Sequence, residues 1–250
     1  MSETDELRER VARACRVLGK LDLAEAATGH ISARVPGTDR ILIRARGPGE
    51  LGVRYTTPDQ VVEADLDGKL IHSGDAGLET PIEVFIHTAV YRKRPEIQSV
   101  VHVHPPTVVL FTICDKPLLP LYGAFDPSGA QMALAGVPTY QRSILISNPK
   151  LGDDLVGAMG NSRVCLMRGH GITTAGRSIE EAALEAITLN SLATMNYRAQ
   201  LLGNPQPIPA EDQEVFRQMA GRGRAEGLTG NKPSGRAAAL WRYYVALTDS

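Results

Sequence analysis

Two histidines that point to the same side of a strand are the first residues in this sequence that could do chemistry. His102 and His104 stand two apart in SVVHVHPPT (99–107), between valines. Because successive side chains of a strand point to opposite faces, the two imidazoles share one face and lie about 6–7 Å apart. Two imidazoles at that separation can bind one ion through bonds of about 2.0–2.1 Å. The alternative is a pair of hydrogen-bonded, partly buried histidines at a strand end.

A third histidine, His170, follows the buried strand expected at 163–168 and lies between two glycines, where the chain leaves the sheet. It could be an incidental histidine in a glycine-rich turn. However, three of the six histidines lie in two strand-end motifs, and three imidazoles with an open position are typical of catalytic metal sites. The pattern predicts that His102, His104 and His170 bind a divalent metal. Nitrogen ligands, with or without one carboxylate, admit Zn, Mn, Fe or Co.

Glu83 lies four residues before His87 on a predicted helix, so the two share one helix face. One hypothesis makes Glu83 part of a capping box, bonded to the backbone N–H of Thr80. The other makes it a carboxylate near the metal, acting as a ligand or a proton carrier. One carboxylate cannot easily reach both places, and the two hypotheses stay open here. His87 is expected to be a hydrogen-bonded core residue, or one that orients a ligand.

The elements that must position these residues follow from hydrophobic periodicity and turn signals. Strands alternate with helices and include hairpins, so the sequence predicts a mixed sheet with helices on both faces. One domain (1–202) is expected, followed by a C-terminal extension (203–250) with a surface segment, a short helix near 211–220 and a terminal helix. Helices are expected near 4–20, 80–94 and 178–201, and strands near 30–35, 40–44, 61–66, 69–72, 99–104 and 163–168.

The composition excludes several classes of partner. Lys plus Arg (27) nearly balances Asp plus Glu (28), so the net charge of −1 gives no electrostatic case for nucleic acid or an anionic membrane. No apolar stretch approaches membrane-spanning length. The N-terminal MSETDELRERVARACRVL is charged from residue 3 onward, so export is not expected. Three scattered cysteines without CxxC spacing are typical of a reduced, cytoplasmic protein.

The run IEVFIHTAVYRKRPEIQSVVHVHPP, followed later by MRGHGI, resembles the class II aldolase and adducin family. In that family a helix glutamate and a histidine four residues on precede an Arg-Pro helix end, an HxH strand and a distant His-Gly. The resemblance spans about residues 5–200. It implies an α/β fold, a three-layer α/β/α sandwich around a mixed, largely antiparallel sheet. It also implies metal binding by the three histidines, a role for Glu83 as ligand or acid/base, and a ring-shaped homotetramer with active sites between subunits.

Departures from the family pattern concern the phosphate site of its sugar-phosphate members. Gly29-His30 replaces a Gly-Asn pair, Pro81-Ile82 replaces two hydroxyl residues, and RARGPGE (44–50) replaces a Thr-Gly loop. The resemblance therefore implies an intact metal site beside a doubtful phosphate site. Guanidinium groups in this region could bind a carboxylate bidentately, and the candidates are Arg44, Arg46 and Arg54. The alternative is that these arginines are merely solvated.

Three functions are compatible with these residues. The first is a lyase that decarboxylates a hydroxylated aromatic acid, of the 3,4-dihydroxyphthalate type, through a metal-stabilised carbanion. The second is an aldolase or epimerase for a sugar phosphate or related hydroxy-ketone, and the third is a non-enzymatic adducin-like binding module. We favour the decarboxylase. Glu83 and His30 are the candidate proton donors, His30 because its ordinary pKa lies near neutrality. Tyr122 is the candidate for a tyrosine that family members donate to a neighbouring subunit's site.

Overall fold

The computed structural model describes residues 2–72, 77–226 and 235–248, with side chains left undescribed over 220–226. Its centre is one eight-stranded sheet in the order β4-β3-β2-β1-β5-β8-β7-β6. Every neighbouring pair is antiparallel except β6 and β7. The strands are β1 His30–Arg34, β2 Arg40–Arg44, β3 Val61–Asp65, β4 Leu70–His72, β5 Ser99–Val103, β6 Thr139–Tyr140, β7 Val164–Met167 and β8 Gly171–Gly176.

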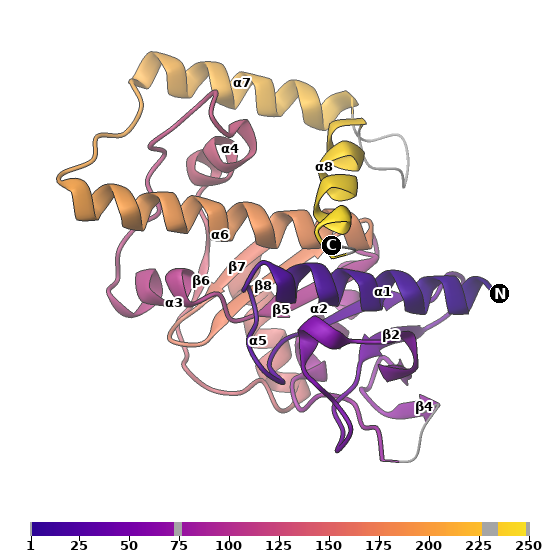
Figure 1. The fold of residues 1–250 in the computed structure, drawn as a ribbon. Helices are drawn as coiled ribbons and strands as arrows, with labels where there is room; N and C mark the ends of the chain where they lie inside the picture. The colour runs from indigo at the N-terminus through magenta and orange to yellow at the C-terminus, as the bar shows by residue number, and fades with distance from the viewer. Residues whose placement is uncertain (1, 73–76, 227–234, 249–250) are drawn as a thin grey trace.

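Helices cover both faces of this sheet, which confirms the predicted three-layer α/β/α fold (Figure 1). One apolar cluster joins the sheet to α1, α3, α4 and α6, and a second joins it to α2 and α5. The helices are α1 Glu3–Lys20, α2 Val84–Lys93, α3 Pro106–Ile113, α4 Pro127–Ala135, α5 Pro149–Met159, α6 Ile179–Leu202, α7 Ala210–Glu226 and α8 Gly235–Ala246, with 3-10 turns η1 Val53–Tyr55 and η2 Pro58–Gln60.

The strand alternation divides β5 between the two clusters. Val101 and Val103 belong to the cluster under α1 and α6, whereas Val100 belongs to the cluster under α2 and α5. His102 is two residues from Val100 and therefore faces the α2 side. Because β5 lies between β1 and β8, its side chains meet residues from both neighbours. The centre of the sheet is thus the place where histidines from separate segments can gather.

Of the two hypotheses for Glu83, the capping box at the start of α2 is wrong. The helix begins at Val84 with Glu83 as its N-cap residue, and no side chain caps it there. The hydroxyl of Thr80 instead donates to the carbonyl oxygen of Gly68, and Ile82 and Glu83 form a turn before the helix. The carboxylate of Glu83 therefore does not cap the helix. By contrast, Ser178 caps α6 as its position predicts, accepting from the backbone N–H of Glu181.

The C-terminal segments pack on the helical layer that contains α6. Helix α8 contacts α1 and α6, while α7 contacts α4 (Figure 1). The helix near 211–220 is longer than expected and extends over Ala210–Glu226, because alanine, glutamate and arginine favour helix strongly enough to outweigh two glycines. Among the described residues, none of the helices has the length and apolar character needed to cross a membrane.

Candidate metal centre

Four side chains from three separate segments converge at the end of β5. Ligand atoms of Glu83, His102, His104 and His170 all lie within 4.8 Å of one another. The Nε2 atoms of His102 and His104 are 2.8 Å apart. Glu83 Oε2 lies 3.4 Å from His102 Nε2 and 3.3 Å from His170 Nε2. The structure therefore brings together the three histidines and the glutamate that the sequence singles out.

Glycines allow the β7–β8 turn to approach the end of β5 closely. Gly169 has a φ of +58°, a backbone conformation that residues with side chains rarely adopt. A Cβ at Gly171 would lie 2.5 Å from His104 Cδ2 and 2.5 Å from the carbonyl oxygen of Val103. Such distances are far inside van der Waals contact, so only glycine fits. The His-Gly pair of the sequence thus has a steric cause, since the glycine lets His170 and His104 share one site.

Glu83 is held by a backbone donor from a loop that the sequence did not single out. The N–H of Ile146 donates to Glu83 Oε1 at 2.8 Å, which leaves Oε2 directed at the histidines. Burial raises the pKa of the Glu83 carboxyl, but the neighbouring His102 and His170 outweigh burial and lower it overall. Glu83 is therefore an ionised carboxylate within the cluster.

The protonation of the imidazoles is compatible with metal binding. His102 Nδ1 lies 3.0 Å from the carbonyl oxygen of Ile172, which accepts only from an Nδ1–H, so Nε2 carries the lone pair. Burial, followed by neighbouring histidines, lowers the pKa of His104 to about 3. The two ring nitrogens of His170 are buried without a hydrogen-bond partner among the described residues, although one lies within ion-pair distance of Glu83. Unpaired buried nitrogen beside a carboxylate fits a bound cation.

His30 lies beside this centre. It is paired with His102 across β1 and β5, and the two ring centroids are 5.1 Å apart. Its Nδ1 is 2.6 Å from His87 Nε2, and burial lowers the pKa of His30 well below its usual value, with His87 adding to the effect. His87 is fully buried and contacts His30 and Ser32 rather than entering the four-residue cluster. His87 is therefore placed to orient His30, as expected of a residue outside the ligand set.

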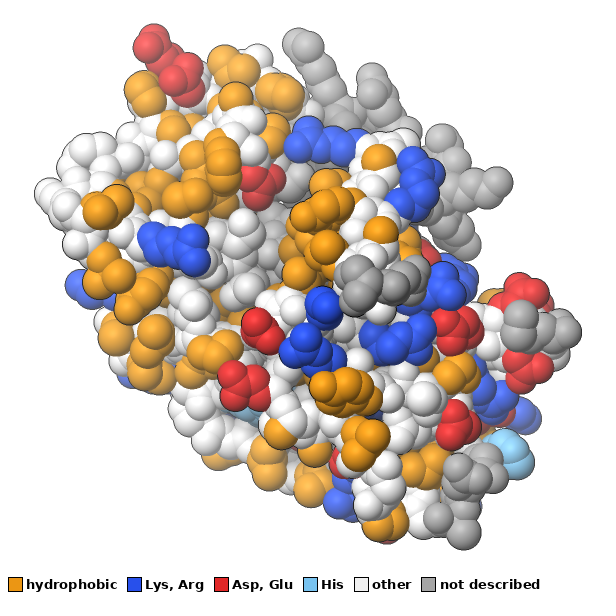
Figure 2. Space-filling model, viewed as in Figure 1, with side chains coloured by type: hydrophobic (Ala, Val, Ile, Leu, Met, Phe, Trp, Pro, Cys, Tyr) orange, Lys and Arg blue, Asp and Glu red, His pale blue; other side chains and the backbone are white. Residues whose placement is uncertain are grey.

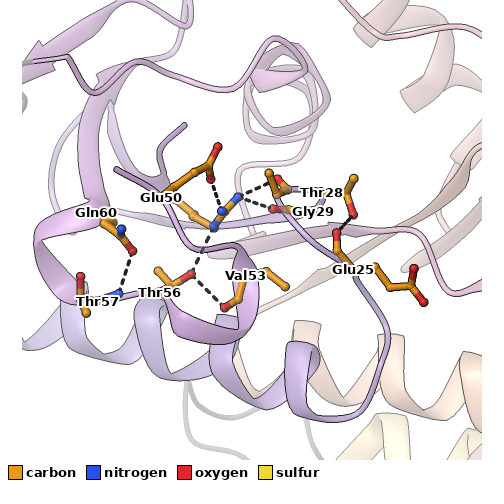
Figure 3. A network of polar contacts seen from close by, with 10 residues as sticks. Glu25, Thr28, Gly29, Glu50, Val53, Thr56, Thr57 and Gln60 are labelled. Carbon is orange, nitrogen blue, oxygen red and sulfur yellow. Dashed lines mark hydrogen bonds and ion pairs between the residues drawn. The ribbon is translucent and has the colours of Figure 1, made fainter. Parts of the chain in front are cut away.

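The three candidate arginines do not converge on one point. Arg44 is 3% exposed, and its guanidinium forms an ion pair with Glu50 and donates to Thr56 and to the carbonyl oxygen of Gly29 (Figure 3). It therefore holds the turn that precedes His30. Arg46 pairs with Glu79 at the surface, and Arg54 is exposed on η1.

Tyr122 is buried next to α4. Its hydroxyl packs against Gly129, where a Cβ would lie 2.5 Å away, and has no hydrogen-bond partner among the described residues. Burial raises the pKa of Tyr122, and the charge of Asp126 raises it further. The ring also contacts Phe125 at a centroid distance of 5.5 Å. Within this chain Tyr122 belongs to the cluster on the α1 and α6 face, whereas His102 faces α2.

Ser32 and Tyr91 are polar residues near the site that motif reasoning missed. Both are buried, and they hydrogen-bond to each other and, through Ser32, to His87. The signal was present in the spacing: Ser32 follows His30 by two residues on a strand, and Tyr91 follows His87 by four on a helix. Each therefore shares a face with a histidine that had already been considered.

Comparison with known proteins agrees with this geometry. Residues 9–197 match the family model described as the class II aldolase and adducin N-terminal domain, which confirms the resemblance. A 3,4-dihydroxyphthalate decarboxylase of Terrabacter sp. (strain DBF63) is 39% identical over 241 residues, covering 96% of this chain and 95% of the relative. A protein of the same name from Arthrobacter keyseri is 39% identical over 217 residues, covering 86% and 87%.

Among solved structures, an aldolase II superfamily protein from Pseudomonas syringae superposes with a TM-score of 0.82. The sequences are 24% identical, and the match covers 100% of this chain and 94% of that one. At this identity the likeness supports the fold alone. The sheet order and the two helical layers described above are therefore shared with a known architecture.

Proposed function

Because this chain belongs to the class II aldolase and adducin family, we propose that it is a metal-dependent carboxy-lyase acting on a hydroxylated aromatic carboxylic acid. The observation that carries the proposal is the 39% identity to a 3,4-dihydroxyphthalate decarboxylase over nearly the whole of both chains. The cluster of one carboxylate and three imidazoles supports it, since that donor set suits a catalytic divalent ion. The cluster argues against a non-enzymatic adducin-like binding module, because such a module has no catalytic metal to bind.

In this proposal His102, His104 and His170 hold the cation, and Glu83 is the fourth candidate ligand. The mixed nitrogen and oxygen donor set leaves Zn, Mn, Fe and Co open. When bound, a divalent cation supplies Lewis-acid stabilisation of negative charge, worth several kcal/mol. The position of Glu83 Oε2, 3.4 Å from His102 Nε2 and 3.3 Å from His170 Nε2, supports a role as a ligand in preference to a role as the proton donor. The hydrogen bond from Ile146 keeps one carboxylate oxygen oriented toward the histidines.

The remaining proton donor of the sequence analysis is His30. Decarboxylation breaks the bond between the ring carbon and the carboxylate, leaves the electron pair on the ring carbon and releases CO₂. The ring carbon then takes one proton, which solvent ultimately replaces. His30 lies beside His102 but outside the four-residue cluster, so it can face the substrate instead of the cation. A positioned donor of this kind contributes about 10²–10⁴-fold in rate.

The substrate's carboxylates need cationic partners. Arg46 and Arg54 are exposed on the loop that follows β2 and remain proposed carboxylate ligands. Arg44 is engaged by Glu50 and by backbone carbonyls, so its proposed part in binding is to fix the loop that carries His30. Such a buried guanidinium, with its partners satisfied, holds a turn rigidly.

We further propose a homotetramer, with Tyr122 serving a neighbouring subunit's site. Hydrophobic side chains gather on the part of the surface formed by α4, α6, α7 and α8, which supports association (Figure 2). Exposed apolar residues there include Leu201, Leu202, Val215 and Met219. We also propose a cytoplasmic location, supported by three free cysteines, of which Cys114 is exposed.

The experiment that tests the proposed function compares two reactions in the purified, metal-loaded protein. CO₂ release is measured from 3,4-dihydroxyphthalate and related acids, and aldol cleavage is measured with fuculose 1-phosphate. We expect CO₂ from at least one aromatic acid and no cleavage of the sugar phosphate. Cleavage of the sugar phosphate, with no CO₂ from any acid tried, would assign the aldolase reaction to this chain instead.

A further inference from the structure

A continuous line of buried polar side chains runs between β1 and α2, away from the metal centre. Three residues of β1 share one strand face, namely His30, Ser32 and Arg34, and three residues of α2 and its N-cap share one helix face, namely Glu83, His87 and Tyr91. Two residues of strand advance about 6.6 Å and four residues of helix about 6.0 Å, so the two rows stay in step. We call this line the polar seam.

Hydrogen bonds connect four residues of the seam, His30, His87, Ser32 and Tyr91, without a break. His30 Nδ1 lies 2.6 Å from His87 Nε2, and His87 Nδ1 lies 2.6 Å from Ser32 Oγ. Ser32 Oγ lies 2.7 Å from Tyr91 Oη. Ser32 and His87 are fully buried, and Tyr91 is 2% exposed. Both nitrogens of His87 are therefore used, and for His30 only Nε2 is left to face a substrate.

Ser32 has no acceptor outside the chain among its described contacts, so its proton is donated within it. With that proton inside the chain and one proton on each imidazole, the chain can carry its hydrogens in only two directions. In the first, Tyr91 donates to Ser32, Ser32 donates to His87 Nδ1, and His87 Nε2–H donates to His30 Nδ1. His30 then carries its proton on Nε2. In the second, every bond is reversed, and His30 carries its proton on Nδ1. The direction of the chain therefore decides whether His30 offers a substrate a donor or a lone pair.

Tyr91 decides between the two directions. In the reversed chain its hydroxyl accepts from Ser32 and must donate elsewhere. Besides Ser32 Oγ, its oxygen has a backbone hydrogen bond from Val100, which donates and offers no acceptor. The guanidinium of Arg34 lies 4.8 Å from the centre of the Tyr91 ring. A guanidinium only donates and cannot accept that proton. A buried hydroxyl without an acceptor is unfavourable, so the reversed chain is disfavoured.

We propose that Tyr91, acting through Ser32 and His87, sets the tautomer of His30, so that His30 presents an Nε2–H donor to the substrate. Tyr91, Ser32 and His87 are positioning residues in this account, since none of them touches the substrate. This proposal depends on the proposed function only for the group that His30 contacts in the substrate, which is an oxygen or a ring carbon that carries negative charge. The tautomer itself follows from the hydrogen-bond chain.

Neutron diffraction from crystals of the metal-loaded protein, exchanged into D₂O, locates these protons directly. We expect deuterium on Nε2 of both His30 and His87 and none on Nδ1 of either. In Ser32→Ala, which disconnects His87 from Tyr91, the preference for one direction is lost, and deuterium on His30 is shared between its two nitrogens. Ser99→Ala is the matched control, because Ser99 is also buried and its hydroxyl donates to the carbonyl oxygen of Ser32, outside the seam. It leaves the wild-type pattern unchanged.

Steady-state kinetics test the consequence. Sharing the proton between two tautomers lowers kcat of Ser32→Ala by about twofold or more, with KM and metal content unchanged. In a His30→Asn background, whose amide donates whatever the state of the seam, Ser32→Ala has no further effect on kcat.

Deuterium on His30 Nδ1 in the wild type, or an unchanged pattern in Ser32→Ala, would overturn the proposal. A wild-type protein that shows the expected deuterium pattern but releases no CO₂ would instead refute the proposed function alone.

Discussion

Gly171→Ala isolates the steric contact on which the metal centre depends. The new methyl group would lie 2.5 Å from His104 Cδ2 and 2.5 Å from the carbonyl oxygen of Val103. Restoring van der Waals contact requires a shift of roughly 1 Å. The clash with the fixed carbonyl moves the turn that carries His170 away from β5, and the clash with Cδ2 moves the imidazole of His104. Metal sites tolerate about 0.2 Å in ligand distance, and the displacement is several times larger.

Mutating a residue that orients a metal ligand weakens metal binding by roughly 10–100-fold. We expect the Kd for Zn²⁺ to rise at least as much in Gly171→Ala, because a ligand itself is displaced. Competition with a chromogenic chelator measures this Kd. Overpacking also costs about 1–3 kcal/mol of stability, which calorimetry of the metal-free protein measures as a lower Tm.

Gly176→Ala is the matched control at the other end of β8, where a Cβ would lie 2.5 Å from the backbone nitrogen of Ala182. It lowers Tm with no change in Kd. If Gly171→Ala bound zinc as tightly as the wild type while losing the same stability as this control, the assignment of His104 as a ligand would be refuted.

Three further predictions concern the metal cluster, the buried arginine and the cysteines. His170→Ala loses bound metal by elemental analysis, whereas His87→Ala keeps it, because His87 lies outside the cluster; equal metal in both would contradict the assignment. Arg44→Met leaves the largely buried carboxylate of its partner unpaired and lowers the free energy of unfolding in urea by about 3–5 kcal/mol. Arg46→Met, at an exposed pair, costs less than about 1 kcal/mol, and similar losses would show that burial does not matter. Cys114 alone is alkylated at neutral pH in the folded protein, because burial raises the pKa of the other two thiols to about 11 and keeps them protonated below that pH; mass spectrometry after labelling counts the modified residues.

The sequence predicted the elements whose signals are local. The helix near 4–20, the helix capped by Ser178 and the hairpin at Asp67-Gly68 are confirmed, because periodicity, caps and turn residues act within a few positions. The three histidines were found for the same reason, since strand alternation and a His-Gly turn are visible in a short stretch. Their convergence needed the pairing of β5 with β8, which no local pattern encodes.

Long-range contacts account for what sequence reasoning could not decide. Whether Glu83 caps a helix or faces the histidines depends on a donor 63 residues away, the N–H of Ile146. The burial of Arg44 likewise depends on a loop that folds over β2 and supplies Glu50. The polar seam requires β1 and α2 to pack at one register, so neither Ser32 nor Tyr91 stood out in its own segment.

The central claim is that this chain needs a divalent ion at Glu83, His102, His104 and His170 to release CO₂ from an aromatic acid. The most direct measurement titrates Zn²⁺ or Mn²⁺ into chelator-stripped protein and records CO₂ release from 3,4-dihydroxyphthalate against metal bound per chain. We predict that activity rises in proportion to bound metal and saturates at one ion per chain. Full CO₂ release from protein that contains no metal would contradict the account.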